Sequence, residues 1–346
     1  MRKGRLLGLI GLLVSVLLTL AGTAAADKTS LVVAVDTPPV SMDPASSFTD
    51  ANFQVVANFF DGLVEHAGYE GQLVPNLAVK WERTGPLTWK IWLRQGVKFH
   101  NGNPFTAEDV VYTFKRMLDP ACCSEFLDTG KMVKSLEVLD DYTVVMTSAD
   151  PNPAFMEYVA FGLILDKESM EKRDLGDITL HPIGTGPYKL VEWVKGSYVK
   201  LTANEEYWAG APPIKNVELQ PITESSTRFA ALASGQVEMI QNVPVELFDK
   251  VKENPNLEII LRPGRRCIHL ALGNQPGKPW ADLRVRKAIY LAINEDEIIE
   301  KLMRGQAIAA TQLADPAETG FVSDIQRLPY DPEQAKKLMA EAGFEK

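Results

Sequence analysis

Short β-rich segments alternate with single helices along nearly the whole chain, and this alternation most constrains the fold. The β-branched run Leu31–Val35 ends shortly before Pro38, which predicts a buried strand opening into a loop. Apolar residues three or four apart between Ala51 and Val64 then predict a helix. This mixture indicates an α/β or α+β layered fold, and a length of 346 residues allows two domains.

The rest of the chain continues the pattern. The alternation in Thr88–Arg94 predicts a half-buried strand. Thr106 followed three residues later by Asp109 predicts a capped helix start. Further strands are predicted at Leu136–Met146 (two, with a tight turn), Tyr188–Val194, Ser197–Thr202, Val217–Ile222, Val237–Ile240, Leu257–Leu261 and Cys267–Leu272. Further helices are predicted at Ser225–Ser234, Glu246–Glu253, Arg284–Leu302 and Pro332–Ala342.

The N-terminus has the three parts of a secretory signal peptide. A basic region that ends at Arg5 precedes the apolar run Leu6–Leu20, and Ala24–Ala26 offers small residues for cleavage. Cleavage after Ala26 would leave a soluble, exported protein, and we expect a periplasmic location. The alternative is a retained membrane anchor. No cysteine lies near the cleavage position, so a lipid-anchored form is not expected.

The charge of the chain argues against nucleic acid as a partner. The formal net charge is −9 and the pI is about 5.2, and no basic stripe is present.

The cysteines and histidines predict neither a metal site nor a defined disulfide. Neighbouring Cys122 and Cys123 are poor partners for each other, and pairing of either with Cys267 stays open. No zinc-ligand spacing is present, and the four histidines are far apart in sequence.

Five groups of residues occur in an order that resembles one known family. They are Leu77, Ala78, Trp81 and Thr88 to Val110; Gly184–Tyr188; Asn204, Tyr207, Trp208, Gly210 and Pro212; Asp282–Asn294; and Tyr330–Gly343. Together they resemble extracytoplasmic solute-binding proteins that include the dipeptide-, oligopeptide- and nickel-binding proteins. The resemblance covers nearly all of the chain after the signal peptide.

The resemblance implies a two-lobed periplasmic-binding-protein fold with an extra subdomain on lobe one. Lobe one would comprise residues 27–56 and 168–262, the subdomain 57–167, and lobe two would begin at 263. A hinge is expected at Arg262–Gly264. Closure of the lobes would bury a solute, which an ABC permease and its ATPases then import.

The sequence departs from the family at its C-terminal side. Relatives continue beyond the segment that resembles Tyr330–Gly343 by on the order of 150 residues, about one domain. In peptide-binding relatives that part carries the Asp and Arg that hold the ends of the peptide. Residues 263–346 are therefore expected to form an incomplete second lobe with exposed apolar surface.

The resemblance also implies a set of ligand-binding residues. They are Ser47, Phe48, Thr49 and Asp50 after the first strand, Phe126 in the subdomain, and His269, Leu270, Leu272 and Asn274 after the hinge. Asp50 is the only carboxylate among them and is the candidate to meet a cationic group of the ligand.

No catalytic residue and no cofactor is predicted. Glu108 and Asp109 are explained by a helix N-terminus, and Gly184–Tyr188 lacks the Lys-Ser/Thr pair of a phosphate loop. We expect a monomeric binding protein for short peptides. The alternatives are another solute, such as an oligosaccharide or a nickel chelate, and an exported hydrolase, for which the sequence offers no nucleophile pattern.

Overall fold

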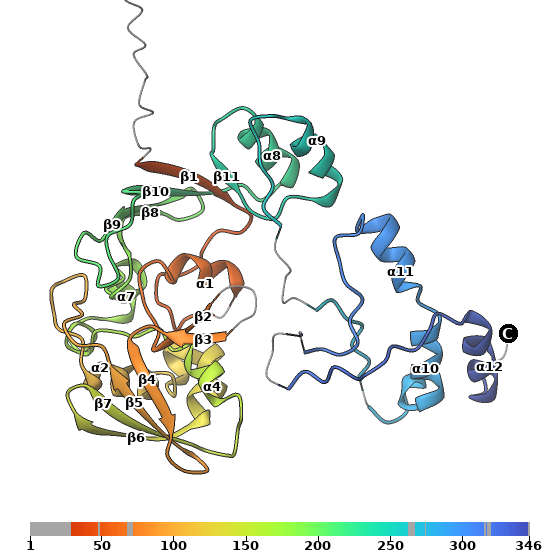
Figure 1. Ribbon diagram of the computed structural model, residues 1–346, viewed down its shortest axis with the longest axis horizontal. Helices are drawn as coiled ribbons and strands as arrows, with labels where there is room; N and C mark the ends of the chain where they lie inside the picture. The colour runs from red at the N-terminus through yellow and green to blue at the C-terminus, as the bar shows by residue number, and fades with distance from the viewer. Residues whose placement is uncertain are drawn as a thin grey trace, which may run out of the picture.

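The computed structural model describes residues 29–47, 49–67, 72–261, 267–273, 275–314, 316 and 320–344, with side chains left aside for 122–124. The predicted signal peptide, 1–26, lies outside the described residues. Within those ranges no helix has both the length and the apolar character needed to cross a membrane. The described residues form three sheets, with helices packed between and against them (Figure 1).

The first sheet joins strands that are far apart in the sequence, in the order β11–β1–β10–β9–β8. β1 is parallel to both of its neighbours, and the remaining pairs are antiparallel. Val33, Ala34 and Val35 are all buried because β1 is covered on both faces, which explains its continuous apolar run. The strands are β1 (Ser30–Val35), β8 (Tyr188–Val194), β9 (Tyr198–Ala203), β10 (Asn216–Pro221) and β11 (Met239–Ile240).

The other two sheets are antiparallel and lie on the far side of helix α1 from the first sheet (Figure 1). The smaller pairs β2 (Val64–Ala67) with β3 (Gln72–Pro75). The larger has the order β4–β5–β7–β6 and comprises β4 (Ala78–Arg83), β5 (Thr88–Leu93), β6 (Val133–Asp140) and β7 (Thr143–Ser148).

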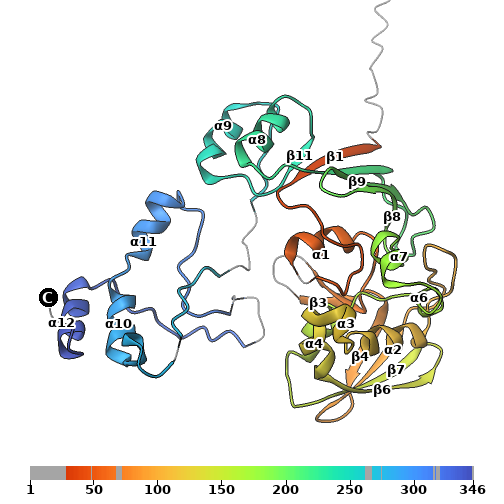
Figure 2. The ribbon, with the colours of Figure 1, turned by 180° about the vertical axis from the view of Figure 1, so that it is seen from behind.

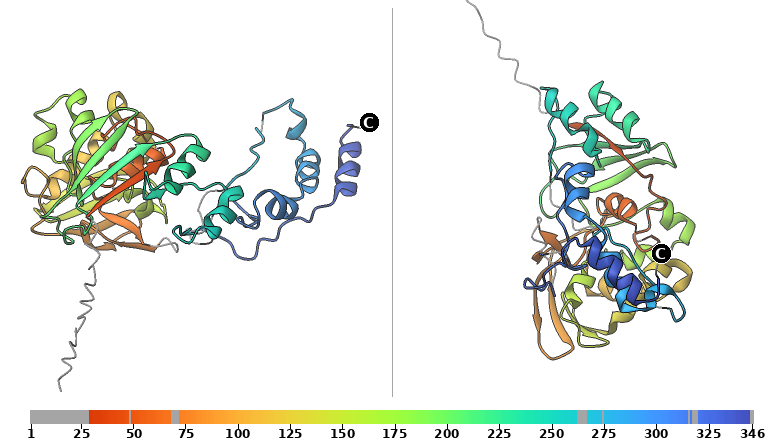
Figure 3. Two further views of the ribbon diagram at one scale, coloured as in Figure 1. Left: turned by 90° about the horizontal axis from the view of Figure 1, so that it is seen from above. Right: turned by 90° about the vertical axis from the view of Figure 1, so that its right-hand side faces the viewer.

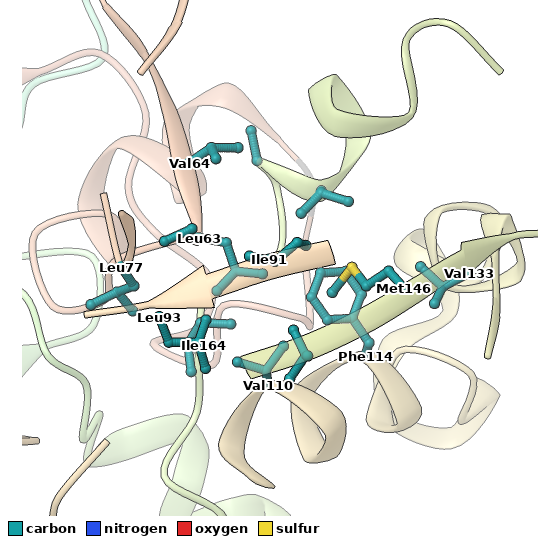
Figure 4. Packing of buried hydrophobic residues seen from close by; sticks show 14 of the residues in the cluster. Leu63, Val64, Leu77, Ile91, Leu93, Val110, Phe114, Val133, Met146 and Ile164 are labelled. Carbon is teal, nitrogen blue, oxygen red and sulfur yellow. The ribbon is translucent and has the colours of Figure 1, made fainter. Parts of the chain in front are cut away.

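Helix α2 (Ala107–Arg116) packs along the larger sheet (Figure 2). The predicted capping box is present, since Asp109 accepts the Thr106 backbone N–H at 2.8 Å. Val110 and Phe114 on its inner face meet Ile91 and other strand residues in the largest core cluster, shown in Figure 4. Full burial of these side chains stabilises the fold by roughly 1.5–3 kcal/mol each.

The helices before residue 262 cover the edges and outer faces of the sheets. They are α1 (Asp50–Val56), α3 (Pro120–Cys123), α4 (Leu127–Met132), α5 (Phe155–Val159), α6 (Lys167–Met170), α7 (Leu175–Leu180), α8 (Ser225–Ala233) and α9 (Phe248–Glu253), with 3₁₀ turns at Ser124–Phe126 and Val245–Leu247. α1 covers one face of the first sheet and α8 covers the other.

The helix predicted over Ala51–Val64 is wrong in its second half. α1 ends at Val56, and Phe59 and Phe60 turn into the core between α1 and the first sheet. The next residue, Asp61, is buried and is held by hydrogen bonds that a continuing helix could not reach. Burial of Phe59, Phe60 and Asp61 in the tertiary structure therefore outweighs the helical spacing of the apolar residues in this segment.

Asp61 links the segment after α1 to the segments that flank β8 and β9 of the first sheet. Its carboxylate accepts hydrogen bonds from the Thr185 hydroxyl at 2.8 Å, the Tyr207 hydroxyl at 3.1 Å and the Trp208 indole at 2.9 Å. Burial raises the pKa of Asp61, and these three donors act in the opposite direction. These hydrogen bonds give two of the sequence motifs a structural role. Thr185 in the loop after Gly184 and the pair Tyr207 and Trp208 all donate to the Asp61 carboxylate.

The loop that precedes α1 is held by a buried ion pair. Both guanidinium ends of Arg116 on α2 donate to the Asp43 carboxylate, at 3.0 and 2.5 Å. The same carboxylate accepts the Ala45 backbone N–H at 3.0 Å. Since both charges are buried, this bidentate contact fixes the course of residues 41–46 relative to the larger sheet.

Residues 267–344 lie to one side of the rest of the molecule (Figure 3). They contain α10 (Leu283–Leu291), α11 (Glu295–Glu297), a π-helical turn (Ile298–Leu302), α12 (Pro332–Glu341) and a 3₁₀ turn (Pro279–Ala281). The single helix predicted over Arg284–Leu302 is therefore interrupted. Asn294 starts a new helix there, because its side chain accepts the Glu297 N–H at 3.1 Å.

The strands predicted at Leu257–Leu261 and Cys267–Leu272 are irregular in the structure. A strand is stable only when a neighbour completes its hydrogen bonds, and no described residue pairs with these segments. Cys267, at the start of the second segment, carries a free thiol.

We predict that Arg116→Met lowers the free energy of unfolding by about 3–5 kcal/mol, because it leaves the buried Asp43 carboxylate without its counter-charge. Chemical denaturation measures this change. The matched control is Lys131→Met, which removes an exposed ion pair with Asp128 and should change stability by less than about 1 kcal/mol. Equal effects of the two substitutions would contradict a stabilising role for the buried pair.

A second prediction concerns pH. Burial lowers the pKa of His100 to about 4, from an ordinary value of 6.5; a backbone hydrogen bond to Gly186 opposes the shift and nearby Lys189 adds to it. The folded state favours the neutral ring. The contribution of His100 to the free energy of unfolding is therefore complete above pH 6.5 and is lost as the pH falls toward 4. The loss should reach roughly 2–3 kcal/mol.

Unfolding measured from pH 7 to pH 4 checks this prediction. The stability difference between the native chain and His100→Gln should shrink by that amount as the pH falls. A constant difference for His100→Gln would show that the ring is not held neutral.

Candidate functional site

The candidate site lies where the loop after β1 enters α1. Ser47 is buried, and its hydroxyl is 3.3 Å from that of Thr49. Thr49 caps α1 by accepting the Asn52 N–H at 3.3 Å. The buried Asn52 carboxamide oxygen in turn accepts the N–H groups of Val40 and Ser41, at 3.0 and 3.2 Å. These contacts fix the direction in which α1 begins and hence where its first side chains point.

The first turns of α1 line a hollow of about 360 Å³. Its walls are Asp50, Phe53, Gln54 and Phe161. The two phenyl rings meet edge to face, with centroids 6.1 Å apart. An exposed carboxylate and a carboxamide therefore stand beside an aromatic surface, which suits a ligand with a cationic group next to an apolar one.

A second hollow, of about 370 Å³, adjoins the first at Gln54, between α1 and the first sheet. Its walls are apolar side chains of the sheet, among them Leu31, Val217 and Met239. Polar groups at its rim are Asp36, Thr37, Asn58 and Gln241.

Tyr188 also lines the second hollow, where its hydroxyl donates to the Ile214 carbonyl at 3.1 Å. Burial raises the pKa of Tyr188, so the phenol stays protonated as a donor.

A buried arginine holds the rim of this second hollow. The Arg228 guanidinium donates to the carbonyls of Ile222, Thr223, Gln241 and Asn242 at 2.7–3.2 Å. Asn242 has a positive φ of 53°. Its amide donates to the Asp36 carboxylate at 2.6 Å. The turn after β11 is thereby fixed against the end of β1, in a conformation that Asn adopts more readily than most residues.

The structure places the predicted site residues in different surroundings. Thr49 and Asp50 are exposed at the start of α1, and the buried Ser47 hydroxyl contacts that of Thr49. Phe126 is 1% exposed and belongs to the core cluster of the larger sheet, so we assign it to packing rather than to ligand contact.

The predicted residues after the hinge stand apart from α1. His269 and Leu270 are exposed, Leu272 is half-buried, and none of them lines either hollow. Phe48 and Asn274 lie outside the described residues. The structure thus places Ser47, Thr49 and Asp50 together at the start of α1. The predicted site residues His269, Leu270 and Leu272 do not join them.

Several residues of the hollows were not predicted. Phe53 fits the apolar face of a helix, and that pattern alone predicts core packing. Gln54 and Asp36 carry no motif, and Phe161 lies about a hundred residues further along the chain.

The described residues offer no group of three His, Cys, Asp or Glu side chains that could hold a metal ion. The site therefore presents charge, amide groups and apolar surface, which are the elements of non-covalent binding.

Comparison with known proteins identifies the family. The model for "Bacterial extracellular solute-binding proteins, family 5 Middle" matches residues 72–346. The chain belongs to this family. The description of the family states that its members are extracellular solute-binding proteins.

Two curated relatives bind different solutes, as their names state. The glutathione-binding protein GsiB of Salmonella paratyphi A is 30% identical over 325 residues, which cover 91% of this chain and 61% of that protein. The heme-binding protein A of Haemophilus influenzae is 28% identical, over 88% of this chain and 60% of that protein. The chain thus spans about three-fifths of the length of the curated relatives it matches.

A solved structure confirms the fold class. The periplasmic binding protein DppA from Helicobacter pylori, in complex with the peptide STSA, superimposes with a TM-score of 0.77 at 27% identity. The match covers 92% of this chain and 67% of DppA. The predicted α/β periplasmic-binding-protein fold is therefore confirmed, and the match spans about two-thirds of the length of DppA.

Proposed function

We propose that this family 5 protein captures short peptides for a bacterial ABC importer. The observation that carries the proposal is the first hollow, where Asp50 and Gln54 stand beside Phe53 and Phe161. A short peptide combines an ammonium group, amides and apolar side chains, and this wall offers a partner to each of them. Glutathione is itself a tripeptide, and the STSA peptide bound to DppA adds support from a second relative.

The division into lobes is part of the proposal. Lobe one would comprise residues 27–56 and 168–262, built on the first sheet, and the subdomain 57–167 would be built on the two antiparallel sheets. Lobe two would begin at residue 263. The first hollow would lie between lobe one and the subdomain, since Phe161 belongs to 57–167, and the second would lie mostly on lobe one. Closure of lobe two over α1 would then remove a bound peptide from water.

The setting follows from the N-terminus and the family. Residues 1–26 would direct export and be removed, which places the mature protein in the periplasm. There it would act as a monomer that delivers peptide to the permease, while the ATPase subunits drive import. No bond in the peptide changes during capture.

Binding to a panel of solutes tests the proposal. The panel comprises di- to pentapeptides, glutathione, heme, cello-oligosaccharides and chelated nickel, each measured by calorimetry and by thermal shift. A ligand at a hundred times its Kd should stabilise the fold by about 2.7 kcal/mol. Peptides alone should bind, and mass spectrometry should recover them intact. Binding of heme or sugar in their place would overturn the assignment, and cleavage of the peptide would indicate a hydrolase.

Asp50→Asn should weaken binding of a peptide with a free amino terminus by about tenfold, since loss of one charge-assisted contact costs on the order of 1.4 kcal/mol or more. The same peptide with an acetylated amino terminus should bind the native chain and the variant equally. Asp128→Asn, at a 92% exposed side chain on α4, is the matched control and should leave both affinities unchanged. If Asp50→Asn leaves the affinity unchanged as well, Asp50 does not meet the ammonium group.

A further inference from the structure

One polar contact joins the residues up to 261 to the residues from 267 on. The Arg304 guanidinium donates to the Asp249 carboxylate, with Nη1 and Oδ2 3.0 Å apart. Among the described residues, no other hydrogen bond or ion pair runs between these two parts of the chain. The Asp249–Arg304 pair is therefore the polar contact that depends on how the two parts are placed relative to each other.

Asp249 stands on a firm support. It lies on α9, whose residues Phe248 and Val251 are buried in the body of the molecule. Because these two side chains are inserted, α9 cannot turn about its axis. The helix thus presents the exposed carboxylate of Asp249 in a fixed direction.

Arg304 is held in a backbone conformation that few residues with a side chain adopt. Its φ is 49°, and that of the next residue, Gly305, is 72°. Two hydrogen bonds close the turn before it. The Met303 N–H donates to the Ile298 carbonyl at 3.0 Å. The Gly305 N–H donates to the Ile299 carbonyl at 2.8 Å. The left-handed conformation of an arginine costs free energy, so this closed turn determines the direction in which its side chain leaves.

The pair forms while both hollows are uncovered. All of the residues that line the hollows lie between Leu31 and Gln241, with Phe161 among them, so no residue from 267 on contributes a wall. A movement that brings the later residues over α1 changes the separation of two groups that are each fixed to their own part. A contact that is present in one arrangement and lost in another shifts the populations of the two.

We propose that the ion pair between Asp249 and Arg304 stabilises the open arrangement of the two parts and thereby lowers the affinity for ligand. The proposal rests on the proposed function, because it assigns a regulation to the same site. Exposed ion pairs contribute little free energy, so this pair opposes closure without preventing it. Loss of the pair should raise the ratio of closed to open chains about two- to fivefold.

The distance between two spin labels in the full chain without ligand tests the proposal. Val191 on β8 and Leu283 on α10 are 61% and 55% exposed, so p-acetylphenylalanine can carry a label at each position without disturbing a core. Double electron–electron resonance then gives the distribution of distances between the two parts. Arg304→Asn and Asp249→Asn should each increase the population outside the main peak about two- to fivefold. Asparagine suits position 304 because it tolerates a positive φ.

Two control variants separate the ion pair from a general effect of substitution. Asp249→Arg combined with Arg304→Asp restores opposite charges and should restore the native distribution. Lys301→Gln removes an exposed ion pair with Glu297 inside the later part and should leave the distribution unchanged. At a salt concentration of about 0.5 M the single variants and the native chain should become alike, because salt screens exposed charges.

Calorimetry with the peptide STSA at low salt adds a second readout. Arg304→Asn and Asp249→Asn should each bind this peptide about two- to fivefold more tightly than the native chain, because closed chains are more abundant. Absence of STSA binding to the native chain and to both variants would count against the proposed function alone, since the distances are measured without ligand.

Three results would overturn the proposal. The first is an unchanged distance distribution in both single variants. The second is a charge-swapped variant that keeps the distribution of the single variants. The third is weaker binding of STSA by Arg304→Asn and Asp249→Asn, which would show that the pair belongs to the closed arrangement.

Discussion

The buried carboxylate of Asp61 is the constraint that holds the segment after α1 against the segments that flank β8 and β9. Because a buried carboxylate is costly without hydrogen-bond donors, the chain brings Thr185, Tyr207 and Trp208 to it from positions more than a hundred residues away. The loop at Gly184 passes so close to Phe59 that a Cβ on Gly184 would lie 2.1 Å from the Phe59 carbonyl oxygen. This glycine is therefore required by packing.

The same junction determines where the side chains that line the first hollow stand. The Asp43–Arg116 ion pair fixes the loop before α1 against the larger sheet, and Asp61 fixes the chain shortly after α1. Helix α1 is thus held at both ends, and Asp50, Phe53 and Gln54 are presented on a rigid support. A preformed wall on one lobe lowers the conformational entropy lost on binding, which suits a protein that captures dilute solutes.

Local patterns in the sequence were sufficient where local interactions decide the structure. The capping box at Thr106, the hairpin of β8 and β9 and the continuous apolar run of β1 were all predicted. Prediction failed where contacts between residues far apart in the sequence determine the local structure. The helix through Ala51–Val64 ends early because Asp61 is needed elsewhere, and the strands expected at 257–261 and 267–272 have no partner among the described residues. Of the residues that line the first hollow, Asp50 was expected only from the family resemblance, whereas Phe161 reaches the hollow only through the tertiary fold.

Two parts of one chain therefore differ in how far their surfaces are satisfied. The described residues up to 261 form a packed body that carries both hollows, whereas α10 and α12 share only a small buried contact. Native-state hydrogen exchange of the chain alone tests this difference most directly, because amide protection reports local stability segment by segment. Amides of β5, β7 and α2 should exchange only through global unfolding, and those of α10 and α12 should exchange orders of magnitude faster. Equal protection of α10, α12 and β5 would show that both parts fold as one cooperative unit, and would contradict the account.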